Sequence, residues 1–246
     1  MERERITAVG KLTVHSLEAG SGDPMVFLHG WSQHAASSEH IRAMLGHRYH
    51  VLAPSHIGFG KSSALPHDAF SIADFGHTYA AWLVQRQLTN VTLVGHSLGG
   101  AIAQVIAAVA PASTVKRLIL IDTLGVTFQR SEMQWTWLWL QKEVRNLMTA
   151  PKRHARFLVR PFITHLLTRP RNLFTLSTLS KQLDVQEYAK QIRVPTEIIW
   201  GDKDTFVPRS VGEQLHQLIP QSKIVTIPGG HDWPLLEPEK LLPFVE

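Results

Sequence analysis

The chain has 246 residues, 44% of them hydrophobic, a formal net charge of +5 and no cysteine. This length can bury one large core, and the lack of cysteine excludes disulfides, thiolate metal sites and a cysteine nucleophile. No apolar run reaches the roughly 18 residues of a transmembrane helix, and the charged start MERERITAVG argues against a secretory signal peptide, so we expect a cytoplasmic globular protein.

Short apolar runs alternate with helix-like stretches along most of the chain. Runs such as MVFL, VTLV, LILI and EIIW are almost continuously apolar, which is typical of strands buried on both faces of a parallel sheet. The expected strands are Lys11–Leu17, Met25–His29, Tyr49–Ala53, Val91–Val94, Arg117–Ile121, Glu197–Trp200 and Lys223–Ile227. The expected helices are Ala35–Leu45, Ile72–Leu88, Leu98–Val109, Ser210–Leu218 and Pro238–Val245. This alternation predicts a doubly wound α/β sheet, with an antiparallel hairpin at the N-terminal edge, where no helix separates the first strands.

One long segment breaks the alternation. Residues 126–193 contain no strand pattern and are expected to form three or four helices. Three prolines punctuate them: Pro151, Pro161 and Pro170. We interpret residues 126–193 as a helical cap over the carboxyl edge of the sheet, and residues 1–125 and 194–246 as the core domain.

The excess of positive charge lies in this cap. No acidic residue occurs between Val144 and Leu183, whereas basic residues recur there: Arg145, Lys152, Arg153, Arg156, Arg160, Arg169, Arg171 and Lys181. A solvated basic face explains the pattern, and contact with membrane lipid or an anionic ligand is the alternative. No nucleic-acid-binding motif accompanies the charge, so we expect no nucleic acid partner.

The stretch LVGHSLGGAI, residues 93–102, ends an apolar run at a sharp corner before a helix. Gly95 to Gly99 fit G-x-S-x-G, the pattern of a nucleophilic serine at a strand-to-helix turn. Both flanks of Ser97 must be small, because larger side chains two residues away would collide at such a turn. The start of the following helix also directs N–H groups at developing negative charge. Ser97 is therefore the predicted nucleophile, and a glycine-rich turn with an idle serine is the alternative.

Three further stretches follow the order that one known family uses. MVFLHGW (residues 25–31) resembles its oxyanion-hole loop, IIWGDKDTFVP (198–208) its acid loop and IPGGHDWPLLEPE (227–239) its histidine loop. With the Ser97 corner, the chain resembles an α/β-hydrolase-fold protein of the serine ester-hydrolase type with a helical cap. The resemblance implies a mostly parallel central sheet with flanking helices and a cap insertion. The motifs specify the reaction less closely than the fold, because this fold hosts many reactions.

The resemblance also implies a catalytic triad. Ser97 needs a base, for which His231 in the Gly-rich histidine loop is the candidate. Asp204 matches the family's acid, which orients the imidazole and stabilises its cation. Asp122 competes for this role, since some relatives carry the acid after the preceding strand, and Asp202 is expected to cap or brace its loop.

By the same resemblance, the oxyanion hole consists of the backbone N–H groups of Trp31 and Leu98. His29 is expected to shape the first of these loops by hydrogen bonding rather than to act as a base. His96 is expected to pack or hydrogen-bond locally beside the serine.

One loop departs from the family pattern. In SHIGFGKSS (residues 55–63), Ser55 and Ile57 stand where aspartate and proline are usual, which bears on local shape and substrate access. Its GKSS ending is not a phosphate loop, because that motif needs glycine where Ser55 stands. The histidine loop also holds one residue more before its proline than the family pattern leads us to expect.

The cap contains the aromatic stretch WTWLWL, residues 135–140. In a helix Trp135 and Trp139 share a face four residues apart. They either pack the cap onto the core or form an aromatic wall over Ser97, and the two roles are compatible. With Phe128 and His29, we assign them to a pocket for a small hydrophobic, ester-like substrate.

The predicted function is that of a serine hydrolase of carboxylic esters that uses an acyl-enzyme and needs no cofactor or metal. Lactonase, thioesterase, C–C hydrolase and perhydrolase reactions fit the same motifs. Haloalkane dehalogenase and epoxide hydrolase are disfavoured, because their nucleophile is aspartate. Two other classes are a non-catalytic ligand receptor and a lipid hydrolase that contacts a membrane surface through its basic cap.

Overall fold

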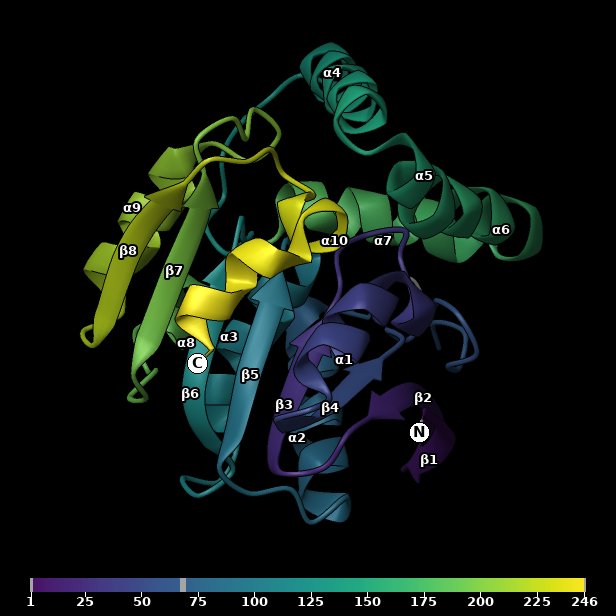
Figure 1. Cartoon of the computed structure of the whole chain (residues 1–246). Helices are drawn as coiled ribbons and strands as arrows, with labels where there is room; N and C mark the ends of the chain where they lie inside the picture. Colours follow the sequence, from purple (N-terminus) through teal and green to yellow (C-terminus); the bar gives the residue numbers. More distant parts are fainter. Residues whose placement is uncertain (1, 67–69, 246) are drawn as a thin grey trace.

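The computed structural model describes residues 2–66 and 70–245. Within these residues, eight strands form one sheet in the order β1-β2-β4-β3-β5-β6-β7-β8 (Figure 1). They are β1 (Arg3–Val9), β2 (Leu12–Ala19), β3 (Asp23–Leu28), β4 (Tyr49–Pro54), β5 (Val91–His96), β6 (Val115–Ile121), β7 (Thr196–Gly201) and β8 (Ser222–Ile227). Strands β3 to β8 pair in parallel, whereas β2 pairs antiparallel with both β1 and β4. The predicted α/β class with a mostly parallel sheet is confirmed.

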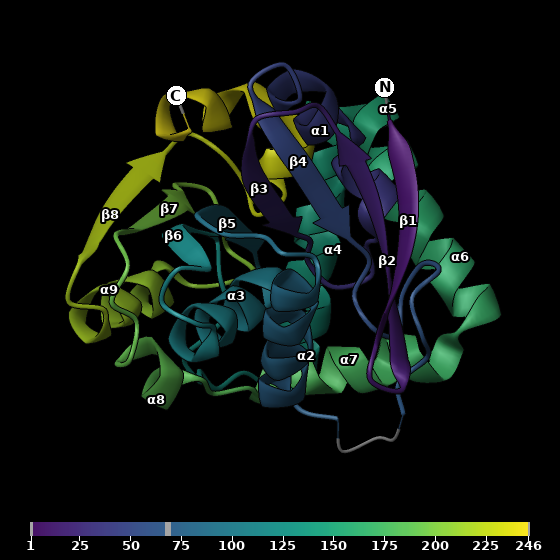
Figure 2. The same ribbon diagram turned by 90° about the horizontal axis from the view of Figure 1, so that it is seen from below.

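Helices cover both faces of the sheet. The helices of the described residues are η1 (Ala35–Ser38), α1 (Glu39–Leu45), α2 (Ile72–Gln85), α3 (Leu98–Val109), α4 (Glu132–Thr149), α5 (Pro151–His154), η2 (Ala155–Val159), α6 (Arg160–Thr168), α7 (Pro170–Gln182), α8 (Gln186–Ala189), α9 (Arg209–Leu218), α10 (Trp233–Leu236) and η3 (Pro238–Phe244). Helices α2, α3, α8 and α9 pack on one face, and α1, α10 and η3 pack on the other (Figure 2). No helix of the described residues is long and apolar enough to cross a membrane.

The side chains of β3 show how the sheet divides the core into two layers. Val26 and Leu28 belong to the layer that contains α2 and α3. Met25 and Phe27 belong to the layer that contains α1 and α10. Because successive side chains point to opposite faces, a strand covered on both sides is apolar at every position, which explains the unbroken run MVFL.

The two ends of the chain differ most from the expected elements. The N-terminal antiparallel hairpin is confirmed, but its first strand, β1, is not among the expected strands. That strand is a largely exposed edge strand with charged side chains, which hide its pattern. At the C-terminus, Pro238–Phe244 is a 3₁₀ helix with Pro243 inside it, and the short helix α10 precedes it.

Helices α4 to α7, between β6 and β7, lie over the carboxyl ends of the parallel strands (Figure 1). Pro151 and Pro170 begin α5 and α7, where a missing N–H has no cost. Pro161 does not end a helix. The π-helical turn η2 directly precedes α6, and its wider geometry accommodates this proline in one continuous helical stretch.

A histidine of α6 joins these helices to two core loops. His165 Nδ1 donates to the Ser32 carbonyl at 3.0 Å, and its Nε2 accepts the Gly60 amide at 3.0 Å. The first loop follows β3 and the second follows β4. Helix α6 is therefore fixed to the loops that follow β3 and β4.

Candidate active site

Ser97 stands at the turn between β5 and α3. Its backbone has φ +53° and ψ −118°, outside the regions that residues with a Cβ favour. Space requires the flanking glycines: a Cβ at Gly95 would lie 2.6 Å from Gly100 Cα, and one at Gly99 would lie 2.3 Å from the Leu28 carbonyl oxygen. The small flanks therefore permit a tight turn that presents Ser97 at the carboxyl edge of the sheet.

The three residues expected to form a triad lie in one hydrogen-bonded row. Ser97 Oγ donates to His231 Nε2 at 3.0 Å, and His231 Nδ1 donates to Asp204 Oδ2 at 2.8 Å. Ser97 and His231 are buried, and Asp204 is a half-buried residue whose side chain has no exposed surface. This geometry can move a proton from the serine hydroxyl to the imidazole and hold the resulting cation beside a carboxylate.

Backbone hydrogen bonds fix the acid loop. Asp204 Oδ1 accepts two backbone amides of its own loop, at 2.8 and 3.0 Å, which turns Oδ2 toward His231. Asp202 Oδ1 accepts the Gly229 amide at 2.9 Å and so ties the acid loop to the histidine loop. The structure thus places Asp202 in a bracing position.

The competing acid, Asp122, lies directly after β6 and is fully buried. Its Oδ1 accepts the Gly201 amide at 2.7 Å. Burial and the neighbouring Asp204 carboxylate raise the pKa of Asp122 well above its usual range. His231 Nδ1 donates to Asp204 Oδ2, whereas Asp122 Oδ1 accepts a backbone amide, so the geometry favours Asp204 as the partner of His231.

Two other histidines hold backbone around the site. His96 Nε2 donates to the His231 carbonyl at 2.9 Å, and burial lowers the pKa of His96 to about 4. His29 Nδ1 donates to the Gly30 carbonyl at 2.8 Å, and its Nε2 accepts the His56 amide at 3.0 Å. Burial and the neighbouring His56 lower the pKa of His29 well below its usual value. The hydrogen bonds of the two rings position the histidine loop and the loop after β3.

The two residues expected to supply the oxyanion hole lie on neighbouring loops. Leu98 is the first residue of α3, where backbone amides lack partners within the helix. Trp31 follows β3, and its indole Nε1 donates to the Leu173 carbonyl of α7 at 2.9 Å. The tight packing of Gly99 against Leu28 brings the two loops together.

Two cavities, of about 330 and 280 Å³, meet at Ser97. We call them the first and the second cavity. The residues that line both are Trp31, Ser97, Trp139, Phe162 and Phe206. Ring centroids of Trp31 and Trp139 each lie 5.9 Å from that of Phe162, so aromatic rings separate the compartments. A substrate that straddles Ser97 can place one group in each cavity.

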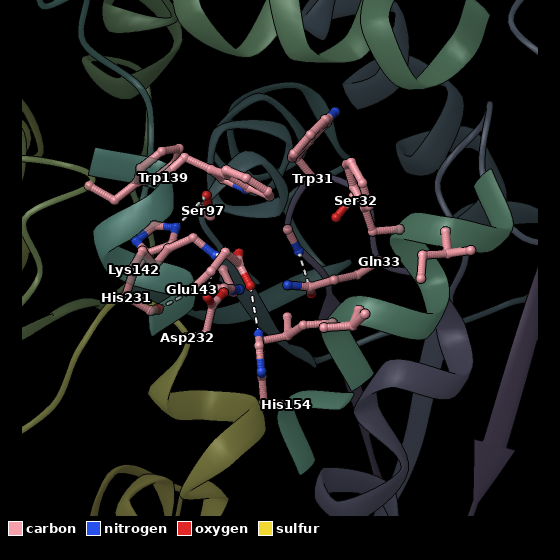
Figure 3. Close-up of a pocket in the computed structure, with 17 residues that line it drawn as sticks. Trp31, Ser32, Gln33, Ser97, Trp139, Lys142, Glu143, His154, His231 and Asp232 are labelled. Atoms are coloured by element: carbon pink, nitrogen blue, oxygen red, sulfur yellow. Dashed lines mark hydrogen bonds and ion pairs between the residues drawn. The ribbon is translucent and has the colours of Figure 1, made fainter. Parts of the chain in front are cut away.

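A group of charged residues lines the first cavity beside His231 (Figure 3). Lys142 Nζ donates to Asp232 Oδ2 and to Glu143 Oε1, both at 2.7 Å, and His154 Nε2 donates to Glu143 Oε2 at 2.6 Å. Burial opposes the charge of Lys142, but the two carboxylates outweigh it and raise the pKa of the ammonium. Burial likewise opposes the charge of Asp232, but Lys142 outweighs it and lowers the pKa of this carboxyl. We call these four residues the Lys142 cluster.

The four residues assigned to the pocket from sequence divide into two pairs. Trp135 lines the second cavity and Trp139 lines both. Phe128 lines neither, because it packs behind Trp135 with 5.3 Å between ring centroids. His29 lies in the core, because both of its ring nitrogens are engaged with backbone groups of the neighbouring loops. The pocket assignment is corrected for Phe128 and His29.

Local sequence gives one signal for the Lys142 cluster, namely that Asp232 adjoins His231. Its partner Lys142 lies 90 residues earlier, on α4, and only the fold brings them together. Phe206 is likewise unmarked in the acid loop, although its ring centroid lies 5.1 Å from that of His231. These contacts could not be read from residue type and spacing.

Two groups of three side chains have metal-ligand spacing among the described residues, with atoms within 4.8 Å of one another. They are His96, His231 and Asp232, and Asp122, Asp204 and His231. Both groups depend on His231, whose two ring nitrogens already contact Ser97 and Asp204. The geometry therefore suits proton transfer through His231 better than metal ligation.

The chain matches the model of the alpha/beta hydrolase family over residues 25–243, and it belongs to that family. It is 25% identical to Lipase 1 of Psychrobacter immobilis over 237 residues, which cover 88% of this chain and 73% of the lipase. It is also 25% identical to 2-hydroxy-6-oxo-2,4-heptadienoate hydrolase of Pseudomonas putida over 243 residues, which cover 89% and 86% of the two chains. These relatives support a hydrolase activity in general.

A solved structure agrees with this family assignment. An esterase from Exiguobacterium antarcticum superposes with a TM-score of 0.83 at 24% identity, and the match covers 100% of this chain and 98% of the esterase. At this identity the likeness shows the fold. The α/β-hydrolase fold expected from the four motifs is therefore confirmed.

Proposed function

We propose that the protein is a cofactor-independent serine hydrolase that cleaves carboxylic esters of small hydrophobic substrates. The observation that carries the proposal is the row of Ser97, His231 and Asp204 at the junction of two cavities. A lipase and a hydrolase among its relatives add support for bond hydrolysis.

The proposed reaction proceeds in two steps. Ser97 Oγ attacks the ester carbonyl carbon while His231 Nε2 takes the hydroxyl proton, and His231 then gives that proton to the leaving alcohol. The acyl group stays on Ser97 until a water molecule attacks it while His231 Nε2 takes a proton from that water. His231 then gives the proton back to Ser97 Oγ as the acyl–oxygen bond breaks and the acid leaves. In both steps the Asp204 carboxylate stabilises the imidazolium and keeps Nε2 directed at Ser97.

In the same proposal the Trp31 and Leu98 amides bind the oxyanion. Gln33 Oε1 accepts the Gly30 amide at 3.0 Å, and the Trp31 indole is bonded to α7, so the loop that carries the Trp31 amide is held on both sides. A donor that is fixed before the reaction stabilises developing charge without reorganisation. Loss of one such donor typically costs about 10²–10³ in rate.

The charge of the two cavities favours a neutral ester over an anionic dienoate. Among the described residues that line the two cavities, two side chains are lysines, Lys142 and Lys181, and none is an arginine. Both lysines are paired with carboxylates. Lys142 faces two carboxylates, so no positive charge remains to balance a substrate carboxylate. Burial of an unpaired anion is costly, and esters are therefore the better substrates.

The test is hydrolysis of p-nitrophenyl esters with two to twelve acyl carbons, wild type beside Ser97→Ala. Multiple turnover that collapses in the variant supports the proposal, and the best chain length measures the cavity that receives the acyl group. Turnover that Ser97→Ala retains would refute Ser97 as nucleophile. Stoichiometric ligand binding without turnover would favour a receptor.

A second candidate is an ester hydrolase that works at a lipid surface. On α4, six apolar side chains are between 48% and 81% exposed: Met133, Trp137, Leu140, Val144, Leu147 and Met148. Their spacing of three and four residues places them on one face of the helix, and the basic residues Arg145 and Lys203 lie beside it. An apolar face with basic neighbours suits an anionic membrane surface.

Vesicle binding separates this candidate from a hydrolase of dissolved esters. Binding to anionic vesicles that weakens with salt and is lost in Trp137→Glu would support it. Equal hydrolysis of dissolved esters with and without vesicles, and no binding, would exclude it.

A further inference from the structure

The Lys142 cluster has hydrogen-bond donors and acceptors that remain unused on the side that faces the first cavity. An ammonium has three N–H donors, and the two hydrogen bonds of Lys142 go to Asp232 and Glu143. Lys142 Nζ lies 5.8 Å from the centroid of the Phe206 ring, which offers no acceptor comparable to an oxygen. Lys142 and Glu143 both line the first cavity, with side chains 11% and 20% exposed. One donor and the remaining lone pairs of Glu143 are therefore available to a molecule in that cavity.

The charges of the cluster select the kind of group that fits. Two carboxylates surround one ammonium, so an added anion would meet repulsion. An aliphatic group would displace water from the free N–H and leave it unpaired, which is unfavourable in a buried site. A hydroxyl group both accepts and donates, so it can accept from Lys142 and donate to Glu143 at once.

The second cavity offers a different lining. Its own residues are mostly aromatic or small, and its lysine, Lys181, is paired with Glu132. Ser97 lies between the two cavities, so the two arms of an ester would meet different surroundings.

We propose that the Lys142 cluster is a binding subsite for a hydroxyl group, so that preferred substrates are neutral esters with a hydroxyl on the arm that fills the first cavity. This inference rests on the proposed ester hydrolysis at Ser97. It names the substrate class of that reaction and makes Lys142 and Glu143 specificity-determining residues.

The experiment compares matched esters that differ only at the end of one arm. The pairs are ethyl hexanoate with ethyl 6-hydroxyhexanoate, and hexyl acetate with 6-hydroxyhexyl acetate, extended to four and eight carbons and followed by acid release. We expect one arm to show a kcat/KM about ten-fold or more higher for the hydroxyl ester, as a hydrogen bond to charged groups provides. The monoester of the matching dicarboxylic acid should react more slowly than the methyl-ended ester.

Two variants and a control assign the preference. Lys142→Met should bring the ratio of hydroxyl to methyl kcat/KM close to one, and Glu143→Gln, which keeps an acceptor oxygen but loses the charge, should lower the ratio. Lys181→Met, in the second cavity, should keep the ratio. Calorimetric titration of Ser97→Ala with both esters measures the difference in their affinities without catalysis. The subsite is therefore tested even if no ester is turned over. Ser97-dependent hydrolysis with no hydroxyl preference on either arm would overturn the subsite and leave the ester hydrolase intact. If no ester is turned over but the titration shows a hydroxyl preference, the ester hydrolase is overturned and the subsite is kept.

Discussion

The backbone of Ser97 leads to a prediction about stability as well as activity. Ser97→Ala and Ser97→Gly both remove the hydroxyl, but only glycine also removes the Cβ that conflicts with φ +53° and ψ −118°. A residue held in such a region costs about 1–3 kcal/mol, while glycine loses about 0.4–1 kcal/mol through the greater freedom of the unfolded chain. We therefore expect Ser97→Gly to exceed Ser97→Ala in free energy of unfolding by about 0.5–2 kcal/mol.

Denaturant unfolding of the two variants, followed by fluorescence, measures this difference, and each kcal/mol should raise Tm by about 2–4 °C in a chain of this size. The matched control is Ala107→Gly, in the last turn of α3, where the backbone is helical. There the same loss of a Cβ should destabilise by roughly 1 kcal/mol. If Ser97→Gly is also less stable than Ser97→Ala, the turn stores no strain and our account of the G-x-S-x-G geometry is wrong.

Three further predictions concern the site around that serine. Asp204→Asn should lower turnover about 10⁴-fold, whereas Asp122→Asn should keep most of it; the opposite result in ester hydrolysis would exchange their roles. The folded-state pKa of Asp122 lies above its unfolded value of about 3.9. The free energy of unfolding therefore falls as the pH rises from the unfolded-state pKa through the folded-state pKa. The fall amounts to about 1.4 kcal/mol for each pH unit between the two pKa values. Asp122→Asn should remove this fall and be more stable than wild type at pH 7, and unfolding curves at pH 4 and 7 check it. Trp139→Ala should move the ester preference toward bulkier groups, because this ring lines both cavities; an unchanged chain-length profile would contradict that position.

Local patterns predict the centre of the fold well. The strand before Ser97 and the helix after it follow from an apolar run, a required pair of glycines and a helical pattern, all within about twenty residues. The strand β1 escapes this reasoning, because an exposed edge strand has no buried face to impose an apolar pattern. Pro161 wrongly predicts a break between helices, because the π-helical turn before it lets the helix continue.

The site itself is only partly readable from sequence. Ser97, Asp204 and His231 stand in motifs, and the structure brings them within hydrogen-bonding distance. The Lys142 cluster depends on where α4 lies over the histidine loop, and that packing leaves no local signal. His29 shows the same limit, because a histidine in a loop beside the serine looks like a pocket residue until its contact with the His56 amide is known.

The proposed mechanism requires that Ser97 is a nucleophile activated by His231. The most direct measurement is covalent labelling with a p-nitrophenyl alkylphosphonate, with the labelled peptide located by mass spectrometry. We expect one phosphonyl group per chain, attached to Ser97, and slow or absent labelling in His231→Ala. Labelling at another residue, or equal labelling of Ser97 in His231→Ala, would contradict it.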